Sequence, residues 1–300
     1  PTKIRNILKK KWSENKYLMN QIKSSKIPSH TLSNAILDVA KAYKTGFTNL
    51  KRGNVKFFRI RPKKAKHHIQ TLSLEASAFS KVYNTFCSRT LGKNIKTSKL
   101  IKGINRDCRL TWNKRNGNMI LHVPTEVYKV KILNRKSECA LDPGIRTFQT
   151  LYSVNGVSDL GEGLNFTIKK YLDILESKKE HQNEKWYKKF SRRIYDKLKH
   201  KVDDLHWKTA RLLCQNYDTI LIGNLSTRGI VRRGGCLNRK TRNISMFAQH
   251  YTFRQRLIAK AEELDSKVYV VDEAYTSKTC GKCFKRNNNL YGSKTFKCEC

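Results

Sequence analysis

The stretch Cys139-Ala-Leu-Asp-Pro-Gly-Ile-Arg-Thr-Phe-Gln-Thr-Leu-Tyr-Ser153 carries an acid at the end of an apolar run. The run before Asp142 predicts a buried strand, Pro143-Gly144 predicts a tight turn, and the residues beyond the turn predict a second strand. Asn155-Gly156 then turns the chain into a third short strand. We therefore expect three consecutive strands, with Asp142 held where the first one ends.

The segments that follow alternate between helical and extended patterns. Residues 168–213 are charged and have the apolar spacing of one long helix. Residues 219–223 and 267–272 are short apolar runs that predict buried strands, and residues 247–264 predict another helix. Three strands, a helix, a strand, a helix and a strand is the order of an RNase H-like α/β domain. The stripe predicted to be buried on the long helix is Tyr187, Phe190, Ile194, Leu198, Val202 and Leu205.

Upstream of this domain the sequence predicts a β-rich module with helical insertions, over residues 1–135. Residues 29–50 have apolar residues at spacings of three and four, which predicts an amphipathic helix. Residues 109–123 read as two strands joined by a turn at Asn116-Gly117. The predicted apolar stripe of the helix is Leu32, Ile36, Val39, Tyr43, Phe47 and Leu50.

A strongly basic run follows the amphipathic helix, over residues 56–66. Phe58 and Ile60 alternate with Arg59 and Arg61, which predicts a half-buried strand with a cationic outer face. Such a run is commonly a solvated surface, but the charge of the whole chain favours contact with phosphate groups. The predicted nucleic-acid-binding residues are Arg59, Arg61, Lys63, Lys64 and Gln70.

The composition points to a folded protein that binds polyanions. The chain has 300 residues, room for about two domains, and 63 Lys and Arg against 23 Asp and Glu give a net charge of +40. That charge argues against an ordinary metabolic enzyme, and 38% hydrophobic residues exclude a disordered basic tail. We expect no membrane partner, because no apolar run is long enough to span a bilayer and the first residues lack the apolar core of a signal peptide.

The cysteines divide into five scattered residues and a cluster. Scattered single cysteines are typical of a reducing, intracellular compartment. The cluster is Cys280-x-x-Cys283, fourteen residues, and Cys298-x-Cys300. Two cysteine pairs separated by a polar loop favour a structural Zn²⁺ site over a chance cluster or a redox pair. The second pair has an unusual spacing, so the fourth ligand is either Cys300 or a residue beyond it.

Two acids at strand ends are candidates for catalytic chemistry. Asp142 precedes a turn that clears space for a ligand, and Glu273 follows the last predicted strand. Mg²⁺ prefers hard oxygen ligands, and phosphodiester hydrolysis needs several converging carboxylates. The simpler readings are that Asp142 only closes an Asx-turn and that Glu273 is a surface residue entering a loop.

Three motifs together resemble a known family. They are Leu141-Asp-Pro-Gly-Ile-Arg146, Asp204-Leu-His-Trp-Lys208 and Tyr275-Thr-Ser-Lys-Thr-Cys-Gly-Lys-Cys283. In this order and spacing they resemble the TnpB family of transposon-encoded RNA-guided nucleases, and most closely its eukaryotic and viral branch, the Fanzor proteins. The resemblance implies a wedge-like β-barrel with a helical recognition insert over residues 1–135. It also implies a RuvC nuclease domain over residues 136–300, with a zinc finger at 278–300.

The resemblance also implies a set of three catalytic acids. Asp142 matches the first. The fourth strand ends in Gly223-Asn224, where bacterial members carry a glutamate, so the second acid is missing from its usual place. Glu273, at the end of the neighbouring strand, is the candidate for a migrated second acid. The third acid is expected beyond residue 300.

The implied activity is RNA-guided, metal-dependent cleavage of DNA next to a short adjacent motif. The implied partners are a guide RNA and target double-stranded DNA, bound by a monomer within a ribonucleoprotein complex that is nuclear if the host is eukaryotic. The implied cofactors are one or two catalytic Mg²⁺ ions on Asp142 and Glu273, and a structural Zn²⁺. The alternatives are a nuclease-dead relative that only binds guided DNA, and a general zinc-ribbon RNA-binding protein.

Overall fold

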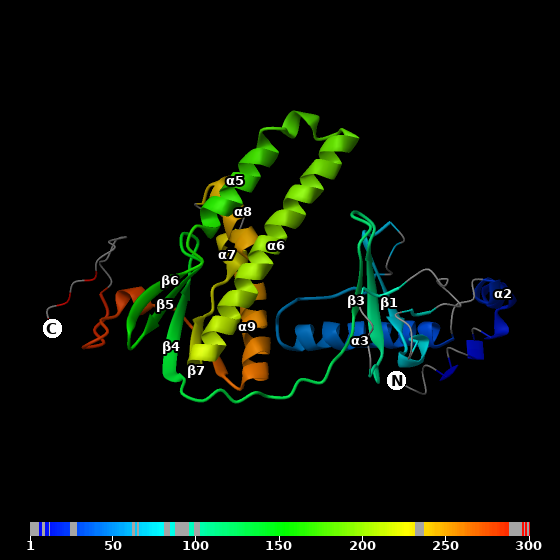
Figure 1. Cartoon of the computed structure of the whole chain (residues 1–300), viewed down its shortest axis with the longest axis horizontal. Coiled ribbons are helices and arrows are strands. Elements are labelled where there is room, and N and C mark those ends of the chain that lie inside the picture. Colours follow the sequence, from blue (N-terminus) through cyan, green and yellow to red (C-terminus); the bar gives the residue numbers. More distant parts are fainter. Residues whose placement is uncertain are drawn as a thin grey trace. The chain divides into compact units, whose positions relative to one another are not determined.

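The chain forms two compact units, Pro1–Glu126 and Val127–Cys300, which we describe separately (Figure 1). The computed structural model describes residues 6–7, 10–11, 13–24, 29–61, 64, 66–80, 85–87, 96–98, 103–231, 237–287, 296, 298 and 300. Within these ranges no helix is both long enough and apolar enough to cross a membrane.

The first unit combines helices with a three-stranded antiparallel sheet. Its core consists of Leu74, Phe86, Cys108 and Leu110. The predicted helix and hairpin are both confirmed, and Gly117 at the hairpin turn has φ +75°, which favours glycine. The elements are α2 (Lys16–Ser24), α3 (Ser29–Lys51), β1 (Ile69–Leu74), β2 (Cys108–Asn113) and β3 (Met119–His122), and the sheet order is β1-β2-β3. The described strands form an open sheet, and a closed barrel stays a prediction.

The strand predicted in the basic run is wrong for the part of the run that the structure describes. Residues 56–61 contain no strand. Phe58 instead packs edge-on against Phe47 of α3, with ring centroids 5.0 Å apart, and a Cβ on Gly46 would overlap the Phe58 ring. In this run the apolar side chain of Phe58 therefore packs on α3, and the described residues do not pair with a neighbouring strand.

The second unit is built on a mixed five-stranded sheet with helices, which confirms an α/β class. The strands are β4 (Lys136–Pro143), β5 (Gln149–Ser153), β6 (Gly156–Leu160), β7 (Tyr217–Gly223) and β8 (Lys267–Val271). Their order is β6-β5-β4-β7-β8; β4, β5 and β6 are antiparallel neighbours, and β7 is parallel to β4 and β8. The predicted succession of three strands, helix, strand, helix and strand is observed, except that the first helical segment is divided.

Of the two helical segments predicted as single helices, the first is broken and the second is observed with a later start. The first is a hairpin of α5 (Leu164–Glu176) and α6 (Lys185–Asn216), seen in Figure 1. Residues 177–184 between them are all polar, so they have no apolar face to bury and the chain can turn there. The second, predicted over residues 247–264, is α9 (His250–Leu264). It begins after Gln249, whose left-handed conformation with φ 49° separates it from α8 (Arg239–Ala248).

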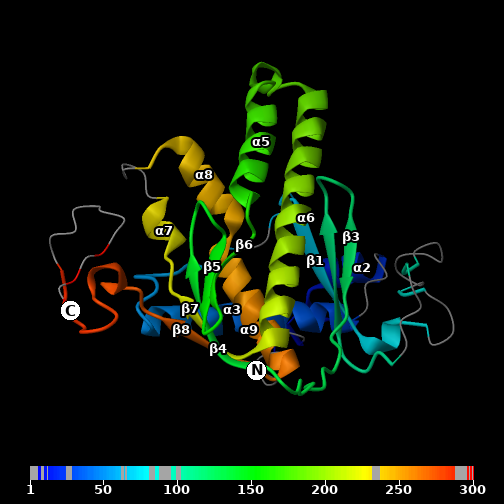
Figure 2. The same ribbon diagram turned by 60° about the vertical axis from the view of Figure 1, so that its left-hand side comes forward.

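One face of the five-stranded sheet packs on helices. Leu141 of β4 and Ile222 of β7 are buried in a core that includes Phe253 of α9 and Leu213 of α6. Residues alternate between the two faces of a strand, so Asp142 lies on the face opposite Leu141. Figure 2 shows α6 and α9 beside the sheet.

The prediction of a buried last strand is wrong. Tyr269 and Val270 of β8 are 52% and 44% exposed. β8 is at the edge of the sheet in the described part of the chain, with β7 as its only neighbouring strand, so its apolar residues are covered on one side only.

Candidate functional site

Asp142 and Gly223 lie next to each other at the carboxyl edge of the sheet. The parallel register of β4 and β7 pairs Leu141 with Ile222, so the next residue on each strand, Asp142 and Gly223, follows in the same register. Leu141 and Ile222 both face the helices, and their successors therefore share the opposite face. A side chain at position 223 would consequently point toward the space beside Asp142.

Glu273 fills the space that a side chain at position 223 would occupy. A Cβ added to Gly223 would overlap the carboxylate Oε1 of Glu273 and lie 2.8 Å from its Cγ. Val271 of β8 pairs with Gly223, so the chain leaves β8 level with this edge and the Glu273 side chain crosses back over β7. The glutamate thus reaches its place from the neighbouring strand, and only a glycine at position 223 leaves room for it.

The electrostatics show that the two carboxylates are neighbours. Burial raises the pKa of Glu273, and the charges of Asp142 and then Asp272 raise it further. The Oε1 atom of Glu273 is buried and has no hydrogen-bond partner among the described residues. A cation bound between Asp142 and Glu273 would satisfy this oxygen and relieve the repulsion. Carboxylate oxygens are the ligands that Mg²⁺ prefers, so the residues present fit such an ion.

Asn224 is directed to the other side of the sheet. Its Oδ1 accepts a hydrogen bond from Nη1 of Arg254, on α9, at 2.5 Å. The alternation of side chains along β7 explains this, because Asn224 continues the helix-facing series of Ile222. Position 223, not 224, is therefore the one that faces Asp142. The sequence located the missing acid at Gly223-Asn224 but did not distinguish between the two positions.

Three stacked rings support the turn that follows Asp142 and Pro143. Phe148, at the end of this turn, stacks between His206 and His250, with ring centroids 5.1 and 5.2 Å apart. His206 Nε2 is 3.0 Å from the carbonyl oxygen of Ala248. Burial lowers the pKa of both histidines to about 4, so both rings are neutral at pH 7. The Asp204–Lys208 motif thus contributes a core histidine, and its Asp204 pairs with Lys208 on the surface.

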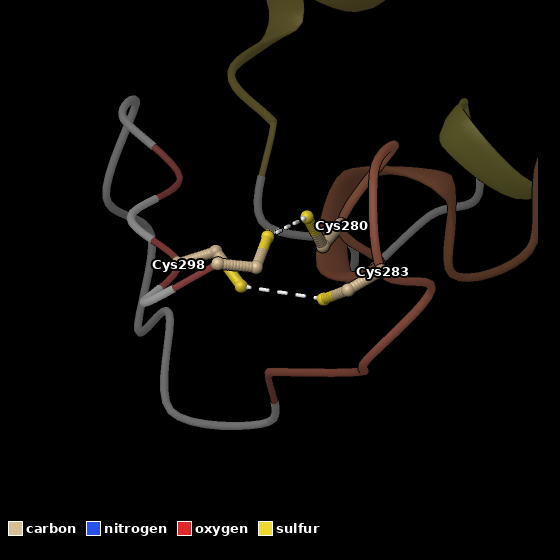
Figure 3. Close-up of side chains that lie close together, drawn as sticks. Cys280, Cys283 and Cys298 are labelled. Atoms are coloured by element: carbon tan, nitrogen blue, oxygen red, sulfur yellow. Dashed lines mark hydrogen bonds between the residues drawn. The ribbon is translucent and has the colours of Figure 1, made fainter.

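The four clustered cysteines converge on one point, as Figure 3 shows for Cys280, Cys283 and Cys298. Their Sγ atoms all lie within 4.8 Å of one another. The Sγ–Sγ distances from Cys280 to Cys300 and from Cys283 to Cys298 are both 3.5 Å. Four sulfur atoms at this spacing fit a tetrahedral metal site, with Cys300 as the fourth ligand.

The turn after Cys280 holds its sulfur among backbone donors. The N–H of Lys282 lies 3.4 Å from the Cys280 Sγ, and the N–H of Phe284 donates to the Cys280 carbonyl at 3.0 Å. The N–H groups of Cys283 and Lys282 lower the pKa of Cys280 to about 6. This thiol is therefore readily ionised, and the thiolate is the form that binds metals.

The predicted nucleic-acid-binding residues have different surroundings. Arg59, Arg61 and Lys64 are exposed, and Lys63 lies outside the described residues. The Gln70 amide donates hydrogen bonds to the carbonyl oxygens of Lys64 and His67, at 3.1 and 3.0 Å. Gln70 thus holds the backbone of the basic run against β1, and its role in binding nucleic acid stays a prediction.

Comparison with known proteins identifies similar sequences along most of the chain. Residues 122–234 match the family described as a probable transposase, and residues 250–300 match the family described as a Cas12f1-like TNB domain. Two TnpB-like proteins of Acanthamoeba polyphaga mimivirus are each 30% identical over 93% of this chain, which corresponds to 56% and 55% of their own lengths.

A solved structure of a CRISPR-Cas12f ternary complex shows a weaker likeness. It covers 71% of this chain and 44% of that chain at 16% identity, with a TM-score of 0.40, which does not establish a shared fold. The sequence matches are stronger, although this chain spans about half the length of the curated relatives it matches. On those matches, the chain is similar in sequence to the TnpB-like proteins over most of its own length.

Proposed function

We propose that this chain is part of an RNA-guided, metal-dependent DNA endonuclease in which Asp142 and Glu273 hold the catalytic ion. The observation that carries the proposal is the position of the Glu273 carboxylate, which fills the space over Gly223 beside Asp142. The sequence similarity to TnpB-like proteins supports the activity, and the strand order β6-β5-β4-β7-β8 supports an RNase H-like, RuvC-type domain. Placement of the glutamate after β8 supports the Fanzor branch.

The two acids have complementary surroundings for holding a cation. Asp142 is exposed at the end of β4, whereas the Oε1 of Glu273 is buried against the backbone of Gly223. When bound, Mg²⁺ would lower the pKa of a water nucleophile and stabilise charge on the leaving oxygen. The strand pairing of β4 with β7 fixes the position of Asp142, and the Glu273 carboxylate already lies against Gly223. The two carboxylates would therefore need little rearrangement to act as ligands.

The remaining parts of the chain would serve binding and support. The four cysteines would hold a structural Zn²⁺, and the basic residues Arg59, Arg61, Lys63 and Lys64 would contact phosphate groups of the guide RNA or target DNA. The net charge of +40 supports binding to the nucleic-acid backbone, because each neutralised phosphate releases a counterion. Base pairing with the guide would then supply sequence specificity.

A nuclease-dead, guided DNA-binding protein is the second candidate. The observation that favours it is that β7 ends in Gly223-Asn224 without an acid, and the Asn224 amide is bound to Arg254 on the helix side. This candidate predicts guided binding without cleavage in any divalent metal.

The deciding experiment compares cleavage and binding by the full-length protein, including any residues beyond 300, in complex with an RNA transcribed from the 3′ flank of the gene. With Mg²⁺ present, Asp142→Ala and Glu273→Ala should each abolish DNA cleavage and leave guided binding near wild type. The charge lost is needed in the transition state and not for duplex recognition. Asn224→Ala should be much milder.

Glu138→Ala is the matched control, because it removes an exposed acid from the same strand as Asp142. It should cleave like the wild type. Normal cleavage by Glu273→Ala would reject the migrated glutamate. A wild-type complex that binds guided DNA but cuts none in Mg²⁺ or Mn²⁺ would establish the nuclease-dead candidate instead.

A further inference from the structure

A cavity of about 430 Å³ lies between α5, α6 and the first turns of α8. None of its lining residues belongs to the carboxylate or the cysteine site. It forms where the helical hairpin turns at residues 177–184, and the Tyr187 hydroxyl closes one side by donating to the Leu175 carbonyl at 3.0 Å. Its volume is within the range of pockets that hold small molecules.

Cations and carboxylates alternate around this cavity. Lys240 Nζ is 3.4 Å from Asp173 Oδ1, and Lys179 Nζ is 3.1 Å from Glu176 Oε1. Arg239 also lines the cavity and forms no ion pair in the part of the chain that the structure describes. The pKa of Glu176 is lowered, first by Lys179 and further by the charges of Arg239 and Lys240, which shows that all three cations are near one carboxylate.

Aromatic rings complete the wall. Tyr187 and Tyr195 of α6 both line the cavity, and Tyr195 is fixed by stacking on Phe247, with centroids 5.8 Å apart and planes 10° apart. Burial raises the pKa of Tyr195, so its ring stays a neutral phenol. A fixed aromatic ring offers a surface on which a nucleobase can stack.

We propose that this cavity binds a single nucleotide. Its phosphate would contact Arg239, the lining cation that forms no ion pair among the described residues. The N–H groups of its base would donate to Asp173 or Glu176 while the base stacks on a tyrosine. A ligand that is anionic at one end and a planar hydrogen-bond donor at the other matches this combination of side chains. The nucleotide is either free or an unstacked residue of a bound RNA. This proposal does not depend on the nuclease activity.

Equilibrium binding of the four ribonucleoside 5′-monophosphates and of a short unstructured RNA tests the proposal in the full chain. Arg239→Ala should weaken binding of at least one of these probes about tenfold, the loss of one charge-assisted phosphate contact. Asn243→Trp, which fills the cavity without a charge change, should weaken the same probe. Arg242→Ala is the control, because Arg242 lies on the same helix and carries the same charge but does not line the cavity.

The pattern of losses separates the two sources of the nucleotide. Losses with a monophosphate show a site for a free nucleotide, and losses with the RNA alone show a site for an unstacked residue of a chain. An equal loss in Arg242→Ala, or none in Arg239→Ala, would overturn the proposal, since binding would then reflect only overall charge. If Asn243→Trp does not fold, the comparison of Arg239→Ala with Arg242→Ala decides alone.

Discussion

The carboxylate site and the cysteine site are built in opposite ways. Asp142 and Gly223 are fixed by the backbone hydrogen bonds of adjacent parallel strands, over a core with side chains that are almost fully buried. The cysteines are carried by a segment whose described regular structure is a short 3₁₀ turn, Thr276–Lys278, and an isolated bridge between Thr279 and Arg286. The first site is therefore formed by the fold, whereas we expect the second to need a bound metal to hold its structure.

Acidification should produce the largest effect, and it should act on the sheet region. His206 and His250 are buried with pKa values of about 4, against about 6.5 in the unfolded chain. Between these values the unfolded state binds more protons, so the stability present above pH 6.5 is lost as pH falls toward 4. Each histidine would cost on the order of 3 kcal/mol over that window.

Urea unfolding of the metal-free protein as a function of pH measures this loss. His206→Gln should flatten the pH dependence, whereas the exposed control His200→Gln should leave it unchanged. Equal slopes for the wild type and His206→Gln would contradict the assignment of the acid sensitivity to the ring stack.

Removal of zinc should produce the next largest effect, a loss of structure confined to the segment that carries the cysteines. Cys280→Ser should lose the single expected zinc and expose residues 274–300 to proteases, because metal binding and folding are coupled at such sites. The Tm of the five-stranded sheet region should change by no more than a few degrees. A shift of that size corresponds to a change of about 1 kcal/mol in its free energy of unfolding. Metal analysis with limited proteolysis checks this, and Cys87→Ser outside the cluster is the control. Fresh, reduced wild-type protein without zinc would contradict the cysteine site.

Gly223→Ala should weaken metal binding at the carboxylate site and leave the cysteine site unchanged. The added methyl group would overlap the Glu273 carboxylate and push it away from Asp142. We expect the affinity for Mn²⁺, followed by its electron paramagnetic resonance signal, to fall about tenfold to a hundredfold. Zinc content should not change. The double variant Gly223→Glu with Glu273→Ala should recover part of the affinity, and unchanged Mn²⁺ binding in Gly223→Ala would show that Glu273 is not a ligand.

Glu273→Gln should produce the smallest effect, and it should stabilise the protein, whereas the other changes weaken folding or metal binding. The raised pKa means that the ionised side chain opposes folding when no metal is present, at pH values above that pKa. Removing the charge should therefore stabilise the metal-free protein by a fraction of about 1 kcal/mol near pH 7, because the side chain is partly exposed. The gain should vanish as the pH falls and the wild-type carboxyl becomes protonated. A loss of stability at pH 7 would show that the carboxylates do not repel each other.

Local patterns in the sequence predicted the parts of the structure that depend on neighbouring residues. The strands around Asp142, the hairpin at Asn116-Gly117 and the helix of residues 29–50 each follow from periodicity and turn chemistry. The spacing of the four clustered cysteines predicted their convergence, because paired thiols on tight turns are typical of structural metal sites. Net charge alone indicated a polyanion partner.

The tertiary structure decided what depends on distant residues. Whether Glu273 reaches Asp142 depends on the parallel register of β4, β7 and β8, whose residues are far apart in the sequence. The exposure of β8 depends on which strand neighbours it, and the break at Gln249 depends on packing of α8 and α9 that periodicity does not encode. The sequence indicated only that the usual acid is missing at Gly223-Asn224, and the fold alone shows that the Glu273 carboxylate occupies the space that a side chain at position 223 would fill.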